Sequence, residues 1–287
     1  MSEVKLAAAQ MACSWDHAEN LKKAEALVRE AAALGARIIQ LQELFETPYF
    51  CQQQKSEYFE LATAMEENPA ILHFRGVARE LEVVLPIPFF ERAKNVYFNS
   101  VAVIDADGEV MGIYRKTHIP HSPGYCEKYY FSPGDTGPRV WRTRYATIGV
   151  GICWDQWFPE LARAMALMGA EIVLYPSAIG SVPGADDFDM CPQWQRSMQG
   201  HAASNLMAVV ASNRVGVEQI DDSEITWFGS SFITDGQGQK IAEAGREAEE
   251  VIVAEVHLDV IRMLRDGLPF FRDRRPETYR SLLEMSG

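Results

Sequence analysis

The sequence predicts an α/β fold in which mixed β-sheets are layered with helices. Short aliphatic and β-branched runs alternate with longer segments whose apolar residues recur at helical spacing. Two hairpins with Asp-Gly turns interrupt that alternation, which indicates antiparallel pairs beside parallel ones. Hydrophobic residues make up 47% of the 287-residue chain, so there is enough apolar material for one large core, although two smaller domains also fit.

The first quarter of the chain predicts a strand, a helix and a second strand. Val4–Met11 is apolar enough for a buried strand. A helix then begins at Asp16, with Glu19 at the capping-box position, and ends at Gly35. Ile38–Leu41 is the next expected strand. The expected apolar face of the helix is Leu21, Ala24, Leu27, Ala31 and Leu34.

The remaining elements continue this alternation to the end of the chain. Two hairpins are expected, with turns at Asp107-Gly108 and Asp235-Gly236. The expected helices are Asn68–Glu80, Pro159–Gly169 with a Leu161/Met165/Met168 stripe, Gln193–Asn205 and the start of the tail from Leu258. The expected strands are Val83–Phe89, Ser100–Asp105, Val110–Arg115, Ala146–Ile152, Ile172–Tyr175, Met207–Ser212, Gly229–Thr234, Lys240–Ala244 and Glu250–His257.

Charge and cysteine content exclude several classes of protein. The formal net charge is −13, which disfavours nucleic acid and anionic membrane surfaces and weakly favours a cationic small molecule. Five widely spaced cysteines do not suggest a disulfide framework. The N-terminus lacks a signal-peptide pattern and no apolar run is long enough to span a bilayer, so we expect a cytoplasmic protein.

Cys153 is the most informative residue of the sequence. It lies between the expected strand Ala146–Ile152 and the expected helix from Pro159. A thiol at such a turn points into a cleft and lies near helix N-terminal N–H groups, which favour developing negative charge. A cysteine nucleophile needs this placement, but a buried structural cysteine fits this segment equally well.

Glu43 and Lys116 stand at comparable places, each just past the end of an expected strand. Side chains at strand ends converge on a cleft in layered α/β folds. A thiol that attacks, a carboxylate that takes its proton and an ammonium that stabilises the oxyanion form a coherent acyl-transfer set. Taken singly, Glu43 also suits a helix cap and Lys116 also suits the charged surface.

The segments around these residues resemble the three motifs of the nitrilase, or carbon–nitrogen hydrolase, superfamily. They are Gln-Glu-Leu at Glu43, Arg-Lys-Thr-His-Ile-Pro at Lys116 and Gly-Ile-Cys-Trp-Asp at Cys153. The resemblance implies a Glu–Lys–Cys triad that hydrolyses non-peptide C–N bonds without a metal or cofactor. It also implies one domain over residues 1–287, folded as a four-layer α-β-β-α sandwich. A homodimer or higher homo-oligomer is expected, with the tail from about residue 258 at the subunit interface.

The same resemblance implies further catalytic groups. Many amidase and carbamoylase members carry a second glutamate, which maps to Glu127 here. Such a carboxylate near Lys116 holds the ammonium in place and helps to position substrate or water. A loop salt bridge with Lys128 is the alternative. The backbone N–H of Trp154 is expected to share the oxyanion with Lys116.

The substrate expected from the sequence is a small cationic ureido compound. Relatives that act on carbamoyl-amino acids carry arginines after the nucleophile, whereas this chain has Asp155 and Trp157, which suit an amine or alkyl chain. Several distant segments resemble the branch of the family that acts on carbamoylated diamines. The other expected substrate-binding residues are Tyr125, Ser177 and Asp187, the last in an acidic loop where Asp186 and Asp189 are equally eligible and where helix capping is an alternative role.

Three alternatives remain at this point. One is another carbamoylase or amidase of the family, similar to a ureidopropionase. Another is a non-catalytic member that acts as a binding protein, which has no need to retain all three triad residues. A metal site is the third, but His118 and His121 are separated by Ile-Pro and no complete ligand set with zinc spacing is present.

Overall fold

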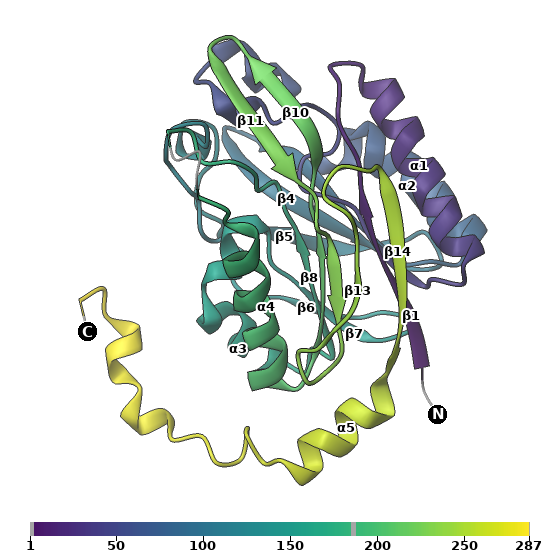
Figure 1. The fold of residues 1–287 in the computed structure, drawn as a ribbon, viewed down its shortest axis with the longest axis vertical. Coiled ribbons are helices and arrows are strands. Elements are labelled where there is room, and N and C mark those ends of the chain that lie inside the picture. Colours follow the sequence, from purple (N-terminus) through teal and green to yellow (C-terminus); the bar gives the residue numbers. More distant parts are fainter. Residues whose placement is uncertain (1–2, 185–187, 287) are drawn as a thin grey trace.

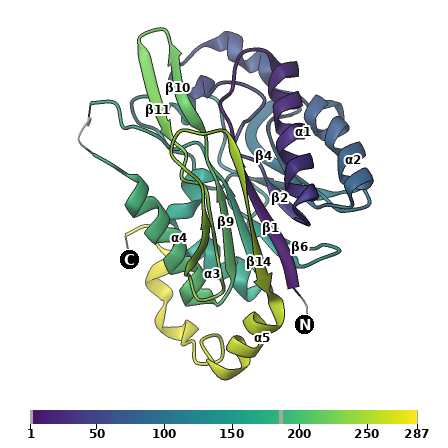
Figure 2. The ribbon, with the colours of Figure 1, turned by 45° about the vertical axis from the view of Figure 1, so that its right-hand side comes forward.

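The computed structural model describes residues 3–184 and 188–286. Two β-sheets face each other, helices α1 (His17–Ala33) and α2 (Pro69–Leu81) cover one sheet, and α3 (Pro159–Leu167) and α4 (Cys191–Asn205) cover the other (Figures 1 and 2). The order of layers is therefore α-β-β-α, which confirms the expected fold class.

The first sheet is assembled from two three-stranded groups. β14, β1 and β2 form one group, with β1 parallel to β2 and antiparallel to β14, and β3, β4 and β5 form an antiparallel meander. A parallel bridge between Ile38 and Val84 joins the groups. The strands are β1 (Glu3–Gln10), β2 (Ile38–Gln40), β3 (Leu85–Ala93), β4 (Val96–Ile104), β5 (Val110–Arg115) and β14 (Glu250–His257).

The second sheet has six strands in the order β13-β12-β9-β8-β7-β6. Its central strands β7, β8 and β9 are parallel, and its outer strands pair antiparallel, so the sheet is mixed. The strands are β6 (Val140–Arg142), β7 (Thr147–Val150), β8 (Ile172–Pro176), β9 (Ala208–Ser212), β12 (Phe232–Thr234) and β13 (Lys240–Glu243).

Burial on both faces explains why the strands are so uniformly apolar. In β1, Leu6 and Ala8 belong to the core between the two sheets, whereas Ala7 and Ala9 belong to the core under α1 and α2. Successive side chains of a strand point to opposite faces, so a strand covered on both sides needs apolar residues at every position.

The ends of α1 follow from its sequence, but its buried face differs from the prediction. Asp16 accepts a hydrogen bond from the Glu19 N–H (3.1 Å), and Gly35 has a φ of 92°. The Glu19 carboxylate, however, accepts from the hydroxyl of Ser14. Leu34, at the C-cap, is 52% exposed because the chain already turns away there. Met168 after α3 is 51% exposed for the same reason.

A hairpin that the sequence did not predict extends from the sandwich. It consists of β10 (Val215–Ile220) and β11 (Ser223–Phe228), which pair antiparallel (Figure 1). Polar residues interrupt both strands, so neither stands out as an apolar run.

The C-terminal tail leaves the body of the molecule after α5 (Leu258–Gly267) and runs as an arm past α3 (Figure 1). Its Phe271 ring lies 5.3 Å from the Arg163 guanidinium and 5.4 Å from that of Arg265. Farther along, Leu283 is 87% exposed. Among the helices of residues 3–184 and 188–286, none has the length and hydrophobicity to cross a membrane.

Candidate active site

Lys116 lies at the centre of a buried group of charges. Its Nζ donates to Oε1 of Glu43 (2.7 Å) and to both carboxylate oxygens of Glu127 (2.9 and 2.7 Å). All three side chains are fully buried. Lys116 directly follows β5, and Glu43 lies three residues beyond β2, so both come from the first sheet.

The two carboxylate oxygens of Glu43 have different surroundings. Oε1 accepts from Lys116 and from the side-chain amide of Asn99 (2.7 Å), which is in β4. Oε2 is buried and has no hydrogen-bond partner within the described chain. One oxygen is thus anchored, and the other is available to accept a proton.

Cys153 comes from the second sheet. It begins a short 3₁₀ helix, Cys153–Trp157, that the sequence did not predict, and α3 then begins at Pro159 as expected. Its φ of 42° is a strained value for a residue with a side chain, which costs about 1–3 kcal/mol. The side chain is 5% exposed, and Sγ lies 3.6 Å from the carbonyl oxygen of Ala178.

Burial and neighbouring charges set the protonation states. Burial raises the pKa of the Cys153 thiol well above its ordinary value, the Glu43 carboxylate adds to this increase, and the Lys116 ammonium opposes it. The resting thiol is therefore protonated and needs a base when it attacks. Burial alone lowers the pKa of Lys116, but the carboxylates of Glu127 and Glu43 outweigh it, so the pKa is raised and Lys116 stays an ammonium.

Glu127 is the second acid of the site. Oε1 also accepts from the hydroxyl of Tyr49 (2.6 Å). Burial raises the Glu127 pKa to about 7, with Lys116 opposing the increase. The alternative salt bridge with Lys128 is not formed in the described part of the chain, because the carboxylate faces Lys116 instead.

A narrow pocket of about 100 Å³ adjoins Cys153 and Glu127. Glu127 is the one charged side chain among its described lining residues, and the rest of the wall is mostly apolar. The Tyr125 hydroxyl donates to the Ser181 carbonyl and accepts from the Gly180 N–H, each at 3.1 Å, which fixes the ring on one side. The lining residues are Pro120, Ser122, Tyr125, Glu127, Cys153, Trp154, Ala178, Ile179, Val182 and Met190.

Comparison with known proteins agrees with this geometry. The model of the carbon–nitrogen hydrolase family matches residues 5–266. The chain belongs to the carbon–nitrogen hydrolase family.

Individual relatives of this carbon–nitrogen hydrolase are similar over almost the whole chain. It is 53% identical to the N-carbamoylputrescine amidase of Oryza sativa subsp. japonica, over 100% of this chain and 96% of the relative. It is 52% identical to the citrullinase of Francisella tularensis subsp. tularensis, over 97% and 98% of the two chains. The crystal structure of a carbon–nitrogen hydrolase from Helicobacter pylori G27 matches with a TM-score of 0.93 and 38% identity, over 99% and 100% of the two chains.

Two residues expected to bind substrate in this hydrolase do not face the pocket. Asp155 is fully buried, and both of its carboxylate oxygens accept hydrogen bonds from the protein. Ser177 is fully buried, and its hydroxyl donates to the side chain of Gln156 (2.9 Å). The expectation is corrected for both residues, because no polar atom of either side chain is free to meet a ligand.

The expected oxyanion donor Trp154 and the remaining expected substrate residues lie in different places. Trp154 lines the pocket and is 37% exposed, whereas the half-buried Trp157 is not among the described lining residues. Asp187 and Asp186 lie outside the described residues. Asp189 pairs with Arg246 at 2.7 Å, which engages its carboxylate.

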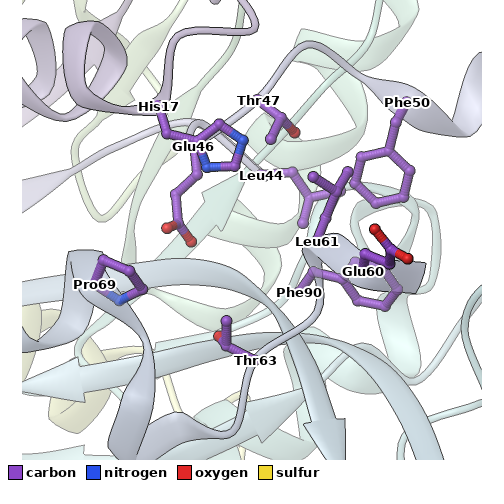
Figure 3. Close-up of a pocket in the computed structure, with 10 residues that line it drawn as sticks. All are labelled: His17, Leu44, Glu46, Thr47, Phe50, Glu60, Leu61, Thr63, Pro69 and Phe90. Carbon is purple, nitrogen blue, oxygen red and sulfur yellow. The ribbon is translucent and has the colours of Figure 1, made fainter. Parts of the chain in front are cut away.

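A larger cavity of about 240 Å³ lies beside the loop that follows Glu43 (Figure 3). Leu44, Glu46 and Thr47 belong to that loop, and Figure 3 shows the carboxylates of Glu46 and Glu60 on opposite sides of the cavity. Burial raises the pKa of Glu46 to about 7. No member of the Glu43, Lys116 and Cys153 group is among the described lining residues, so the smaller pocket is the candidate active site.

Two residues of the site were missed by the sequence analysis. Asn99 holds Glu43, and Tyr49 holds Glu127. Neither belongs to one of the three motifs, and each reaches the site only through the pairing of β4 or the course of a long loop. Two adjacent polar residues, Asn99 and Ser100, within the mostly apolar run of β4 were the one available signal for Asn99.

Proposed function

We propose that the protein hydrolyses N-carbamoylputrescine to putrescine, carbon dioxide and ammonia. The observation that carries the proposal is the buried Glu43–Lys116–Glu127 group beside Cys153, at an apolar pocket with no basic lining residue among those described. The relatives named N-carbamoylputrescine amidase support the same substrate.

In the first half of the reaction, Sγ of Cys153 attacks the ureido carbonyl carbon. Oε2 of Glu43 takes the thiol proton, because this oxygen is free and the resting thiol is protonated. The Lys116 ammonium and the backbone N–H of Trp154 stabilise the oxyanion. Glu43 then gives its proton to the terminal nitrogen, the C–N bond breaks, and ammonia leaves an alkylcarbamoyl thioester on Cys153.

In the second half, water attacks the thioester carbon. Glu43 takes a proton from the water, Glu127 helps to position it, and the C–S bond breaks as the thiol regains its proton. The released carbamate decays to carbon dioxide and putrescine. Neither half of the reaction calls for a metal ion or an organic cofactor.

The far end of the substrate carries an ammonium group. The narrow apolar pocket suits the four methylene groups that precede it, and the exposed indole of Trp154 offers a cation–π contact. We propose Asp187 as the charged partner. Asp187→Asn is expected to raise KM for N-carbamoylputrescine while sparing a neutral N-alkylurea, and equal effects on both substrates would exclude this role.

Citrulline is the second candidate substrate, since one close relative is a citrullinase. Citrulline has the same ureido group but carries a carboxylate next to its ammonium. A buried carboxylate needs a positively charged partner or several N–H donors. The described pocket lining offers no basic side chain, which favours the substrate without a carboxylate.

The test is ammonia release by the purified protein from N-carbamoylputrescine, citrulline, N-carbamoyl-β-alanine and a simple amide, with Cys153→Ala as the blank. Fast turnover of N-carbamoylputrescine alone supports the proposal. Preferential turnover of citrulline or N-carbamoyl-β-alanine keeps the nucleophile but overturns the substrate. If none of these compounds is hydrolysed, the result favours a non-catalytic role.

The assembly and the compartment complete the proposal. We place residues 258–287 at the interface between two copies, since the arm exposes Leu282, Leu283 and Met285. Truncation after Gly267 should lower the number of subunits in the assembly, measured as its mass by light scattering divided by the mass of one chain. An unchanged number of subunits would contradict this placement. All five cysteines are free thiols, which suits the reducing cytoplasm.

A further inference from the structure

Asp155 has an arrangement of contacts that binding to substrate does not explain. Its Oδ2 accepts from the backbone N–H of Ile152 (2.9 Å) and the hydroxyl of Tyr114 (2.7 Å). Its Oδ1 lies 3.0 Å from the backbone nitrogen of His118 and 2.7 Å from the ring Nδ1 of the same residue. The fully buried carboxylate thus has four protein partners, and His118 donates from Nδ1 in the tautomer that fits an ionised Asp155.

The positions of these partners along the chain are informative. Ile152 directly precedes Cys153, whereas Tyr114 and His118 lie two residues before and two residues after Lys116. The Asp155 carboxylate therefore joins the turn that carries the thiol to both flanks of the lysine. Ile152 follows β7 of the second sheet, whereas Tyr114 lies in β5 of the first sheet and His118 just after it, so the Asp155 side chain bridges the two halves of the sandwich.

Capping the short helix at Cys153 needs only the contact with Ile152. The contacts with Tyr114 and His118 are additional. Two further interactions stabilise the residues that contact Asp155. The Tyr114 hydroxyl also lies 3.0 Å from the Thr117 hydroxyl. The His118 ring stacks on Phe158, with ring centres 3.5 Å apart and planes at 4°.

Cys153 and Lys116 have no direct hydrogen bond in the described structure. Within the described residues, the hydrogen bonds of the Lys116 Nζ go to Glu43 and Glu127, and the Cys153 backbone is strained at a φ of 42°. A strained backbone persists only where its surroundings over-determine it. Some other group must therefore fix the distance between the thiol and the ammonium that serves its oxyanion.

We propose that Asp155 is a positioning residue that sets the separation of the Cys153 Sγ and the Lys116 Nζ without touching substrate. This inference rests on the proposed function for the roles of these two groups. The side chain at this position needs two acceptor oxygens, since the Ile152 N–H and the Tyr114 hydroxyl donate to Oδ2 and the His118 backbone N–H donates to Oδ1. The amide of an asparagine turns an N–H₂ group toward two of them and leaves donors unsatisfied.

The first experiment compares Asp155→Asn with wild type. We measure kcat and KM for N-carbamoylputrescine, and separately the rate at which iodoacetamide alkylates Cys153, followed by mass spectrometry. We divide kcat by the fraction of protein whose Cys153 can be alkylated, so that unfolded protein does not lower the value. This normalised kcat is expected to fall on the order of 10- to 100-fold, with little change in KM, as for other groups that orient a catalytic residue. Alkylation of Cys153 is expected to slow as well, because Lys116 no longer favours the thiolate.

Asp135→Asn is the matched control. Asp135 pairs with Arg115, next to Lys116, but its side chain is 64% exposed and contacts no group of Asp155. It should keep wild-type kcat and alkylation. If Asp155→Asn matches this control, or if it loses only folded protein while kcat per alkylatable thiol stays constant, the proposal is overturned.

A second pair of variants decides the matter if Asp155→Asn does not fold. His118→Asn keeps a side-chain N–H near the position of Nδ1, whereas His118→Ala removes it. Recovery of kcat and alkylation in His118→Asn relative to His118→Ala supports the proposal, and equal values for the two variants overturn it. The alkylation assay needs no substrate. If the wild-type protein does not hydrolyse N-carbamoylputrescine, the proposed substrate is wrong, and the alkylation rates still test the role of Asp155.

Discussion

At the scale of single residues, the two carboxylate oxygens of Glu43 have separate tasks. Its Oε1 is anchored by Lys116 and Asn99, and its Oε2 is buried without a partner in the described chain. An unpaired buried carboxylate oxygen is unfavourable unless a proton or a donor arrives during the reaction. The unpaired oxygen is thus the expected site of proton transfer.

Glu43→Gln tests this division. The amide oxygen still accepts from Lys116, so the protein folds, but the amide cannot take a proton. The expected result is a loss of kcat of about 10²–10⁴-fold, measured by steady-state ammonia release. Glu46→Gln, three residues along in the larger cavity, should stay near wild type. Turnover of Glu43→Gln within a few-fold of wild type would contradict the assignment.

The sequence identifies the reacting groups better than the groups that hold them. Glu43, Lys116, Glu127 and Cys153 were all predicted from motifs, and the structure brings them together at one place. The role expected for Asp155 was wrong, because its partners lie about 40 residues earlier in the chain and meet it only when two sheets stack.

At the scale of elements, the loop that carries Glu43 depends on one buried arginine in the segment after β9. The Arg214 guanidinium is fully buried and donates to the backbone carbonyls of Glu43 (2.9 Å) and Thr47 (3.0 Å) and to the Glu218 carboxylate (2.8 Å). Leu44, inside this loop, has a φ of 49°. The planar guanidinium reaches several acceptors at once, as an ammonium cannot.

Arg214→Lys should therefore disturb the loop although it keeps the charge. Loss of two of these bonds is expected to lower the free energy of unfolding by about 2–4 kcal/mol and to reduce kcat more than KM. Urea unfolding and steady-state kinetics measure the two effects. Arg29→Lys, in an exposed ion pair on α1, is the control and should change neither. Equal behaviour of the two variants would show that the fork geometry is unimportant.

Gly134 supports the segment at Lys116 by having no side chain. A Cβ there would lie 2.1 Å from the carbonyl oxygen of Arg115 and 2.8 Å from that of Lys116. Gly134→Ala is expected to displace this backbone and to lower both thermal stability and kcat. Gly76→Ala, in α2 with open space around it, should instead keep activity and gain about 0.5–1 kcal/mol of stability. A Gly134→Ala enzyme with normal stability and turnover would refute the steric argument.

Element boundaries and side-chain faces were less predictable than element types. The helices and most strands of the sandwich lie where apolar runs and caps indicate, within a few residues, but the short strand β6 (Val140–Arg142) was not predicted. The hairpin β10–β11 was missed because its polar residues break the apolar pattern. The 3₁₀ helix Cys153–Trp157 was missed because it is only five residues long and its capping contact, from the Ile152 N–H to Asp155, has no distinctive sequence pattern.

At the scale of the whole molecule, buried titratable groups make stability depend on pH in opposing ways. His201 in α4 is 4% exposed, and burial lowers its pKa from 6.5 to about 4. The unfolded chain binds this proton more tightly, so the contribution of His201 is complete above pH 6.5 and is lost as the pH falls toward 4. Burial raises the Glu46 pKa from 4.5 to about 7, so its contribution is lost as the pH rises from 4.5 to 7.

Two variants separate these contributions. The difference in unfolding free energy between wild type and His201→Gln should rise between pH 4 and pH 6.5, by up to about 3 kcal/mol. The corresponding difference for Glu46→Gln should fall between pH 4.5 and pH 7. Urea unfolding at a series of pH values measures both. Parallel curves for wild type and either variant would mean that the group titrates alike in the folded and unfolded states.

The division of the active site between two sheets has a consequence for how the protein tolerates change. Glu43 and Lys116 move with one sheet and Cys153 with the other, so the thickness of the packing between the sheets is also a dimension of the catalytic geometry. A methyl group added or removed near Val103 and Ile148, both in that inner layer, can leave a well-folded but slow enzyme. The same change under α1 and α2 affects folding alone. Evolutionary drift should therefore be slower in the middle of this molecule than in its outer layers, for reasons of rate as well as of stability.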